Sequence, residues 1–292
     1  MKNKPMKISG AEAVIRSLLA EGVDLIYGYP GGAIMPVYDE LYKFQDSLQH
    51  ILTRHEQGAV HAAQGFARTS GKVGVAIATS GPGATNLITG IADALIDSTP
   101  IVCITGQVAS HLLGTDAFQE TDIIGISTPA TKWSYQITKA NEIPYVMAKA
   151  FYIARSGRPG PVLIDITKDA QFESFDFEYK KCLGIRSYNP LPEINTKKID
   201  EAISIINNAK KPLLVWGQGV ILGRAEEELK SFIEKTGIPA VWTILGLSAL
   251  PTSHPLNMGM VGMHGNYGPN LLTNECDVLI AVGMRFDDRV TG

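Results

Sequence analysis

The sequence predicts an α/β protein built on doubly wound parallel sheets. Short runs of residues that are apolar throughout recur along the chain, and segments of helical length separate them. Such runs are typical of strands that are covered on both faces, as in a parallel sheet between two layers of helices. The chain has 292 residues, more than one typical domain, which favours two α/β domains or one domain and part of another.

The first half of the chain contains a leading helix and a series of strands. From Ser9 to Gly22, apolar residues recur at helical spacing behind a capping serine and before a glycine, which predicts a helix as the first element. Strands are predicted for the runs DLIYG, HILT, VGVAIAT, PIVCIT and PVLIDI, which begin at residues 24, 50, 73, 100 and 161. We expect these elements to form one domain over residues 1–182.

A linker is predicted at residues 183–196, where the periodicity is lost and two prolines occur. A second series of helices and strands follows it, with strands at PLLVWG, PAVWT and CDVLIAVG. A doubly wound domain normally has about five or six strands, and only three are clear here. Residues 197–292 are therefore predicted to form an incomplete Rossmann-like domain, and we expect the chain to be a fragment.

The composition argues against several functional classes. Hydrophobic residues make up 45% and charged residues 19% of the chain, and the net charge is -3, which is typical of a soluble protein that does not bind nucleic acid. The N-terminus lacks the apolar segment of a signal peptide, and no stretch approaches the roughly 18 apolar residues of a membrane span, so we expect a cytoplasmic protein without membrane partners. The three cysteines form no CxxC pair, and His55 and His61 do not have the spacing of an HExxH site, so no metal site built by the protein is expected.

The loops that follow strands carry candidate functional residues, because ligands of open parallel sheets bind at the carboxyl ends of the strands. In YGYPGGAIMP, Gly31 and Gly32 permit either a close approach of the backbone to a ligand or a tight turn into the next helix. TSGPGATN, at residues 79–86, resembles a loop that binds an anion at the start of a helix. It lacks the lysine of a Walker motif, which argues against ATP hydrolysis.

Glu56 lies where a strand-like run gives way to a helix rich in alanine and glycine. An acid in the first turn of a helix is stabilised by the helix dipole by about 0.3 to 1 kcal/mol, so this position has a purely structural explanation. A functional explanation is that small residues leave room for a flat ligand beside the carboxylate. These residues are Gly58, Ala59, Ala62 and Ala63.

In the second half, the loop VWGQGVILG is one residue too long for a GxGxxG dinucleotide motif. No acid ends the following strand, which disfavours an ordinary NAD site. Its glycines, Gly217 and Gly219, fit either the approach of a phosphate or flavin or a plain turn between strand and helix. The segment VGMRFDDRVTG places four charged residues after a strand, a pattern that solvated loops with ion pairs also show. They are Arg285, Asp287, Asp288 and Arg289.

Seven segments together resemble a known family. They are YGYPGGA, RHEQGAVHAAQGFAR, TSGPGATN, GTDAFQE, SGRPGPVLIDITKD, GMHG and RFDDRVTG. Their order and spacing resemble the acetolactate synthase (acetohydroxyacid synthase) large-subunit family of thiamine diphosphate enzymes, over essentially the whole chain. The resemblance implies a pyrimidine-binding domain at residues 1–182 and a central, FAD-associated domain at residues 197–292. The family's diphosphate-binding domain, which carries the magnesium motif, has no counterpart in this sequence.

The resemblance implies a carboligating transferase of branched-chain amino-acid biosynthesis. With thiamine diphosphate and Mg2+, such an enzyme decarboxylates pyruvate and joins the product to a second 2-ketoacid, either pyruvate or 2-ketobutyrate. Glu56 matches the glutamate that hydrogen-bonds N1' of the cofactor's aminopyrimidine, and Gln119 matches a residue that faces the reacting centre. We therefore expect Glu56 and Gln119 to be catalytic. FAD is structural in this family, because the reaction involves no net redox change.

The resemblance also implies sets of binding residues. Thiamine diphosphate is expected at Pro30, Gly31, Gly32, Glu56, Pro82 and Asn86. The substrates are expected at Phe118, Lys168 and Arg289, of which Arg289 resembles the residue that recognises the carboxylate of the second ketoacid. FAD contacts are expected at Arg158, Gly217, Gln218, Gly219, Thr243, Ile244, Leu245, Met263, His264, Gly265, Gly283, Met284 and Arg285.

One further segment departs from the family pattern, and the family's assembly adds expectations about partners. At Ala109 and Ser110 many relatives have a proline and a basic residue, in a loop near the substrate channel. The family's pyrimidine-binding domain meets the diphosphate-binding domain of a neighbouring subunit, so a homodimer or homotetramer is expected, and the fragment alone is expected to be inactive. A small regulatory subunit is a further candidate partner.

Two alternatives remain open. One is another thiamine diphosphate decarboxylase or carboligase of 2-ketoacids, although Glu56 argues against glyoxylate carboligase, which lacks the acid there. The other is a flavin-binding module without catalytic activity.

Overall fold

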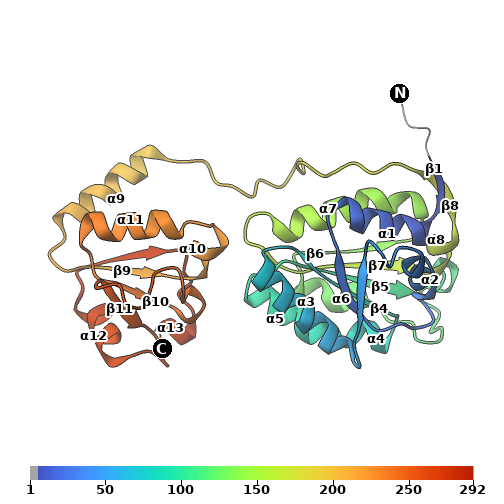
Figure 1. Ribbon diagram of the computed structural model, residues 1–292, viewed down its shortest axis with the longest axis horizontal. Coiled ribbons are helices and arrows are strands. Elements are labelled where there is room, and N and C mark those ends of the chain that lie inside the picture. The colour runs from blue at the N-terminus through green and yellow to red at the C-terminus, as the bar shows by residue number, and fades with distance from the viewer. Residues whose placement is uncertain (1–5, 292) are drawn as a thin grey trace. The chain divides into compact units, whose positions relative to one another are not determined.

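The computed structural model describes residues 6–291 and divides the chain into two compact units, Met1–Pro192 and Glu193–Gly292 (Figure 1). The division lies inside the segment 183–196. Each unit has its own parallel sheet and its own hydrophobic core. The predicted α/β class is confirmed, and the two units are described separately below.

The first unit is built on a six-stranded parallel sheet with the strand order β3-β2-β4-β5-β7-β6. Parallel strands need crossover connections, and helices provide most of them here. The strands are β2 (Leu25–Gly28), β3 (Gln49–Leu52), β4 (Gly74–Ala78), β5 (Ile101–Gln107), β6 (Trp133–Ile137) and β7 (Val162–Thr167).

Helices cover both faces of this sheet (Figure 1). On β4, Val75 and Ile77 pack in one core cluster and Ala76 and Ala78 in the other, because successive side chains of a strand point to opposite faces. One layer consists of α1 (Gly10–Ala20), α2 (Met35–Lys43), α7 (Ile143–Arg155) and α8 (Lys168–Phe172). The other consists of α3 (Glu56–Ser70), α4 (Pro82–Thr85), α5 (Ile88–Ile96) and α6 (Ile123–Ser127). Short 3-10 turns occur at η1 (Ser110–Leu112), η2 (Thr128–Ala130) and η3 (Ala140–Glu142).

The prediction that a helix is the first element is wrong, because a short strand precedes it. β1 (Met6–Ser9) pairs antiparallel with β8 (Ser174–Phe177). The predicted helix α1 begins directly after β1, and the Ser9 hydroxyl caps it by accepting a hydrogen bond from the backbone N–H of Glu12 at 3.1 Å. The four residues of β1, MKIS, contain no continuous apolar run and therefore gave no strand signal.

The second unit is built on a four-stranded parallel sheet with the order β11-β10-β9-β12. Its core includes the fully buried Trp216, whose indole N–H donates to the carbonyl oxygen of Gly246 at 2.9 Å. The strands are β9 (Pro212–Trp216), β10 (Ala240–Trp242), β11 (Asn257–Met260) and β12 (Val278–Val282). The helical segments are α9 (Thr196–Asn208), α10 (Gln218–Leu222), α11 (Glu226–Thr236), η4 (Ile244–Gly246), α12 (Tyr267–Glu275) and α13 (Asp288–Thr291).

The sequence pattern misses β6 and β11, and both strands lie at the edge of their sheets. Four of the five residues of β6 and all four residues of β11 are only partly buried. An edge strand has fewer neighbours than a central strand, so its sequence need not be apolar throughout. The second unit therefore has a fourth strand in addition to the three predicted. Within residues 6–291, no helix is both long and apolar enough to cross a membrane.

Candidate active site

The switch point of the first sheet lies between β2 and β4. From β2 the chain goes to β3 on one side and then returns to β4 on the other, which is where ligands of open α/β sheets bind. The loops that follow β2 and β4 touch here, since the backbone N–H of Ala33 donates to Thr79 Oγ1 at 3.2 Å. A Cβ atom on Gly31 would lie 2.5 Å from the Thr79 side chain, so a glycine is required for this contact.

Glu56 lies beside this switch point, at the carboxyl edge of the first sheet, as the first residue of α3. The preceding residue, His55, is the N-cap, and its Nδ1 accepts a hydrogen bond from the backbone N–H of Gln57 at 3.1 Å. Glu56 itself is only 8% exposed. Its Oε2 accepts a hydrogen bond from Asn86 Nδ2 at 2.9 Å, whereas Oε1 accepts none from the residues that the structure describes. One carboxylate oxygen is therefore fixed by the protein and the other is available to a ligand.

Around Glu56, residues from α4, α2 and β3 come together. A Cβ on Gly83 would lie 2.7 Å from Thr79 Cγ2 and 3.2 Å from Glu56 Oε1, so this glycine lets the loop after β4 approach the carboxylate. Burial, and then the negative charge of Glu56, raise the pKa of Tyr38 well above its ordinary value. The Tyr38 hydroxyl lies 3.4 Å from Nε2 of His50, a ring whose pKa is lowered by burial.

Gln119 is brought to the same edge through its backbone. Gly81, the N-cap of α4, has a φ of 57°, and a Cβ there would lie 2.6 Å from the carbonyl oxygen of Gln119. Gln119 has a φ of 58° itself and is exposed, as is the neighbouring Phe118 at 86%. The loop expected to cradle an anion thus packs on another loop of the protein. Helix α4 has only four residues, too short to attract an anion as a long helix does.

The other residues expected at the cofactor and substrate also follow the carboxyl ends of strands. Pro30 and Gly32 are exposed after β2, and Pro82 is exposed after β4. Lys168 is half-buried directly after β7, and its backbone N–H donates to the carbonyl oxygen of Val108, which follows β5, at 3.4 Å. These residues therefore share one edge of the first sheet with Glu56 and Gln119.

Two of the four small residues of α3 that were expected to leave room for a ligand pack inside the protein instead. Ala59 and Ala63 are fully buried in the core between α3 and the sheet. A Cβ on Gly74 would lie 2.1 Å from the carbonyl oxygen of Ala63, so α3 packs very closely on β4. Gly58 is exposed with open space beside it. Ala59 and Ala63 therefore serve close packing of helix on strand, whereas Gly58 leaves open space.

In the second unit, the residues expected at FAD follow the carboxyl ends of all four strands. The loops after β9 and β12 interlock, because Gly217 N–H donates to Val282 O at 3.0 Å and Gly219 N–H donates to Gly283 O at 2.7 Å. A Cβ on Gly217 or Gly219 would lie within 2.7 Å of the Gly283 backbone. The glycines are therefore required by contacts between two loops of the protein. The same edge carries the exposed apolar side chains of Ile244 and Met263.

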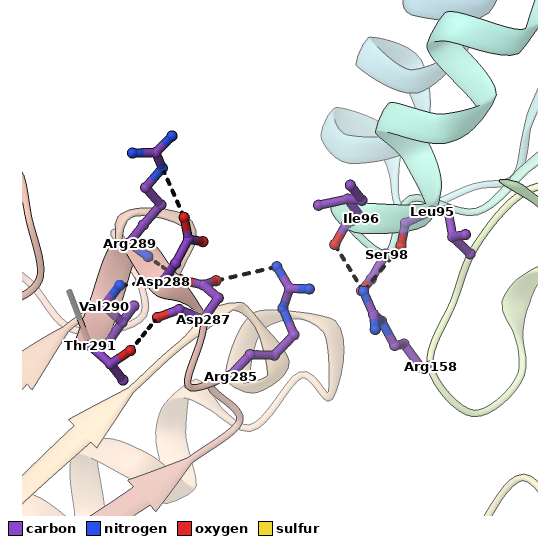
Figure 2. Close-up of polar contacts among 10 residues, drawn as sticks. All are labelled: Leu95, Ile96, Ser98, Arg158, Arg285, Asp287, Asp288, Arg289, Val290 and Thr291. Carbon is purple, nitrogen blue, oxygen red and sulfur yellow. Dashed lines mark hydrogen bonds and ion pairs between the residues drawn. The ribbon is translucent and has the colours of Figure 1, made fainter.

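The arginines expected to bind ligands make contacts within their own units (Figure 2). In the first unit, Arg158 donates to Ser98 Oγ at 2.7 Å and to the carbonyl oxygens of Leu95 and Ile96 at 3.1 and 2.9 Å. These carbonyls end α5, and a cation is favourable at the C-terminus of a helix. The guanidinium of Arg158 therefore has a structural role in the protein itself.

In the second unit, Arg289 belongs to α13, and its side chain is 67% exposed. Its backbone is fixed, since Met263 N–H donates to Arg289 O at 2.7 Å and Asp287 Oδ1 accepts from Arg289 N–H at 3.1 Å. Asp287 is also 3.4 Å from Arg285 (Figure 2). The ion pairs expected for this loop are present, and the second of them joins Arg289 Nε to Asp288 Oδ2 at 3.8 Å (Figure 2). The Arg289 side chain is mostly exposed, so its guanidinium is still accessible to a ligand.

Three residues near the site were not singled out from the sequence. Thr79 lies inside the segment TSGPGATN, but its contact with Ala33 spans 46 residues of sequence. Tyr38 lies in an amphipathic helix, where a tyrosine is unremarkable by pattern. Asp165 is a single acid inside the apolar run PVLIDI, and that interruption was the available signal. Within residues 6–291, no group of three or more His, Cys, Asp or Glu side chains is placed to hold a metal ion.

Comparison with known families agrees with this architecture. Residues 8–126 match the family described as thiamine pyrophosphate enzyme, N-terminal TPP binding domain. Residues 199–292 match the thiamine pyrophosphate enzyme, central domain. The chain therefore belongs to the thiamine pyrophosphate enzymes.

Over nearly its whole length the chain is about 50% identical to the large subunits of acetolactate synthases. It is 52% identical over 288 residues to the acetolactate synthase large subunit of Corynebacterium glutamicum, covering 99% of this chain and 46% of the relative. It is 50% identical over 285 residues to the acetolactate synthase isozyme 2 large subunit of Escherichia coli, covering 98% and 51%. A similar protein of Buchnera aphidicola is 49% identical over 286 residues, covering 97% and 50%. The chain spans about half the length of the curated relatives it matches.

Proposed function

We propose that this chain supplies the pyrimidine-binding part and the central part of an acetolactate synthase, a transferase that forms acetolactate or acetohydroxybutyrate from pyruvate and a second 2-ketoacid. The observation that carries the proposal is Glu56, a carboxylate that is 8% exposed at the switch point and has one oxygen held by Asn86. The similarity to acetolactate synthase large subunits supports the choice of reaction. The proposed domain limits are 1–182 and 197–292, with the linker 183–196 between them.

Glu56 is proposed to hold a proton at N1' of the aminopyrimidine of thiamine diphosphate. A poorly solvated carboxyl group shares a proton with a ring nitrogen more strongly than a solvated one does. The free Oε1 fits this role, because Oε2 is occupied by Asn86 and keeps the side chain from rotating. When bound, thiamine diphosphate supplies the nucleophilic carbanion that attacks the ketoacid. Pro30, Gly31, Gly32 and Pro82 are proposed to contact the cofactor from the loops after β2 and β4.

The substrates are proposed to lie beside the loop after β5. Gln119 would face the reacting atoms, and Phe118, with its 86% exposed ring, would line the channel. Lys168 shares this edge of the sheet. Arg289 is proposed to bind the carboxylate of the second ketoacid with its planar guanidinium.

A flavin is proposed at the carboxyl edge of the second sheet, in a structural role. The exposed Ile244 and Met263 offer an apolar surface there, which fits a planar ring. The contacts proposed in this unit are those predicted from the sequence at 217–219, 243–245, 263–265 and 283–285. Mg2+ is proposed to bind with the diphosphate through residues outside positions 1–292. A homodimer or homotetramer, with a small regulatory subunit, is the proposed assembly, and the term large subunit in the names of relatives supports the latter partner.

The test is an assay for acetolactate with pyruvate, thiamine diphosphate, Mg2+ and FAD. We would compare the chain alone with the chain joined to the part of the Corynebacterium glutamicum relative that lies outside the match. We expect turnover only in the joined protein, with Glu56→Gln lowering it by about 100-fold or more, because general acid-base groups contribute about that much. The control is Glu12→Gln, which removes the first-turn acid of another helix, α1.

The outcomes separate the alternatives. Acetaldehyde without acetolactate would identify a decarboxylase in place of a carboligase. Bound flavin with no ketoacid turnover in the joined protein would favour a flavin-binding module. Normal turnover by folded Glu56→Gln would refute the role proposed for the carboxylate.

A further inference from the structure

Asp165 is a buried carboxylate in the first sheet that has no part in the proposed reaction. Its side chain is 0% exposed, and it forms no ion pair with the described residues. It accepts three side-chain hydrogen bonds instead, from Thr105 Oγ1 at 2.7 Å, Gln136 Nε2 at 2.9 Å and Gln107 Nε2 at 3.2 Å. Burying an acid without a cation is costly, so a carboxylate retained in such a place requires an explanation.

The three donors come from the strands on either side of Asp165. Thr105 on β5 and Gln136 on β6 stand directly opposite Asp165 on β7 in the register of the sheet. Gln107 is two residues further along β5 and therefore points to the same face as Thr105. The carboxylate thus binds three neighbouring strands together close to their carboxyl ends.

Gln107 extends this network into the loop 108–121, which carries Phe118 and Gln119. The Gln107 Nε2 group donates to the carbonyl oxygen of Thr121 at 2.9 Å as well as to Asp165. Its Oε1 accepts a hydrogen bond from the backbone N–H of Val108 at 2.9 Å. One amide therefore contacts both ends of the loop.

The orientation of that amide depends on Asp165. A glutamine amide has a donor end and an acceptor end, and an ionised carboxylate accepts only. The carboxylate therefore holds the Nε2 end of Gln107 toward itself and Thr121, which leaves Oε1 for Val108. An asparagine at position 165 would offer the three donors one acceptor oxygen in place of two, and its N–H2 group would favour the acceptor end of a neighbouring amide, so the preference for this orientation of Gln107 would be weakened.

Of the two loop ends that Gln107 contacts, the end at Thr121 is the one next to the proposed reacting centre. Thr121 follows Gln119 by two residues, and the backbone of Gln119 lies against Gly81 at the switch point. The other end has a separate attachment, where the backbone N–H of Ser110 donates to Asp169 Oδ1 at 2.9 Å. Displacement of Thr121 would therefore move Gln119 while the start of the loop stays attached.

We propose that Asp165 is a positioning residue for the active site, which orients the Gln107 amide so that it fixes the loop 108–121 and places Gln119 beside Gly81. The inference rests on the proposed function where it assigns Gln119 to the reacting centre. The attachment of the loop through Gln107 and Asp165 is a property of this chain alone.

The first test is hydrogen exchange of the loop amides, measured on the chain by mass spectrometry. Three variants are compared: Asp165→Asn, Gln107→Met and the matched control Gln136→Met, which removes a donor to the same carboxylate on the side away from the loop. The informative amides are those of Gly114, Thr115, Glu120 and Ile123, which donate hydrogen bonds within or next to the loop. We expect exchange at least about tenfold faster in Asp165→Asn and Gln107→Met and within about twofold of wild type in Gln136→Met.

The second test is turnover by the joined protein described above. We expect Gln107→Met and Asp165→Asn to lower kcat by about tenfold or more with little change in the affinity for thiamine diphosphate, and Gln136→Met to retain kcat. Equal exchange in all variants, or equal loosening by Gln136→Met, would overturn the attachment. Faster exchange with unchanged kcat would overturn the link to the active site. A failure of the proposed function would appear as a joined wild-type protein without turnover. The exchange measurement would still test the attachment of the loop, because it needs neither cofactor nor turnover.

Discussion

Replacing Asp165 with asparagine is expected to remove a pH dependence from the stability of the first unit. Burial is the main reason why the pKa of Asp165 is raised from 3.8 to about 6. The hydrogen bonds from Thr105, Gln136 and Gln107 lower the pKa but do not offset burial, and the charge of Asp122 raises it further. The folded protein therefore binds the proton more tightly than the unfolded chain does.

The sign and the size of this pH dependence of stability follow from the linkage between protonation and folding. A pKa raised from 3.8 to about 6 corresponds to about 3 kcal/mol of unfolding free energy, which is fully present below pH 3.8 and lost as the pH rises through about 6. Between pH 7 and pH 5 the wild type should gain about 1.4 kcal/mol from this group. Asparagine does not titrate, so the variant should lack this gain.

Urea unfolding of wild type and Asp165→Asn at both pH values measures the effect. The transition of the first unit can be followed through the amide protection of β5 and β7, whose strands are buried throughout. The unfolding free energy of wild type relative to the variant should rise by about 1.4 kcal/mol on going from pH 7 to pH 5. Parallel changes in the two proteins would refute the reasoning, because they would mean that Asp165 titrates alike in the folded and unfolded states.

Two sets of variants, one at Thr79 and one at glycines, test the packing around the switch point. Thr79→Val should cost about 1 to 3 kcal/mol in urea unfolding, since it leaves the backbone N–H of Ala33 without its acceptor, whereas Thr79→Ser should cost less; equal losses would show that the hydroxyl is not the important group. Gly81→Ala should destabilise by about 2 kcal/mol, because φ is 57° and the new Cβ would meet Gln119 O at 2.6 Å. Gly58→Ala, exposed in α3 with open space around it, should stabilise by about 0.5 to 1 kcal/mol; a loss in both glycine variants would contradict the distinction.

The central strands and most helices of the fold follow from local sequence. β4, β5 and β7 are apolar over nearly their full length because helices cover them on both faces, and this is the pattern that predicts them. β1, β6, β8 and β11 escape prediction because polar residues or glycine interrupt their apolar residues, whereas the partly covered β12 is apolar throughout and is predicted. Their positions are set by pairing with distant strands, as in β1 with β8.

The candidate site is predicted unevenly for a related reason. Glu56 and Gly31 lie in short segments whose composition is unusual, so the segments themselves draw attention to them. The Asp165 network joins residues separated by 29 to 60 positions, and no periodic pattern records such contacts. The sequence does not reveal the packing role of Ala59 and Ala63, because it cannot show whether an alanine faces a ligand or a strand; Ala63 faces β4.

The interlocked glycine loops of the second unit affect how genetic results there should be interpreted. Gly217, Gly219 and Gly283 occupy the space next to one another, so any side chain introduced at one of them displaces the backbone of another. Substitutions at these glycines would inactivate the protein through misfolding, whether or not it binds a flavin. Alleles that truncate Ile244 or Met263, whose side chains are exposed at the same edge, would report on a bound partner without disturbing the interlock.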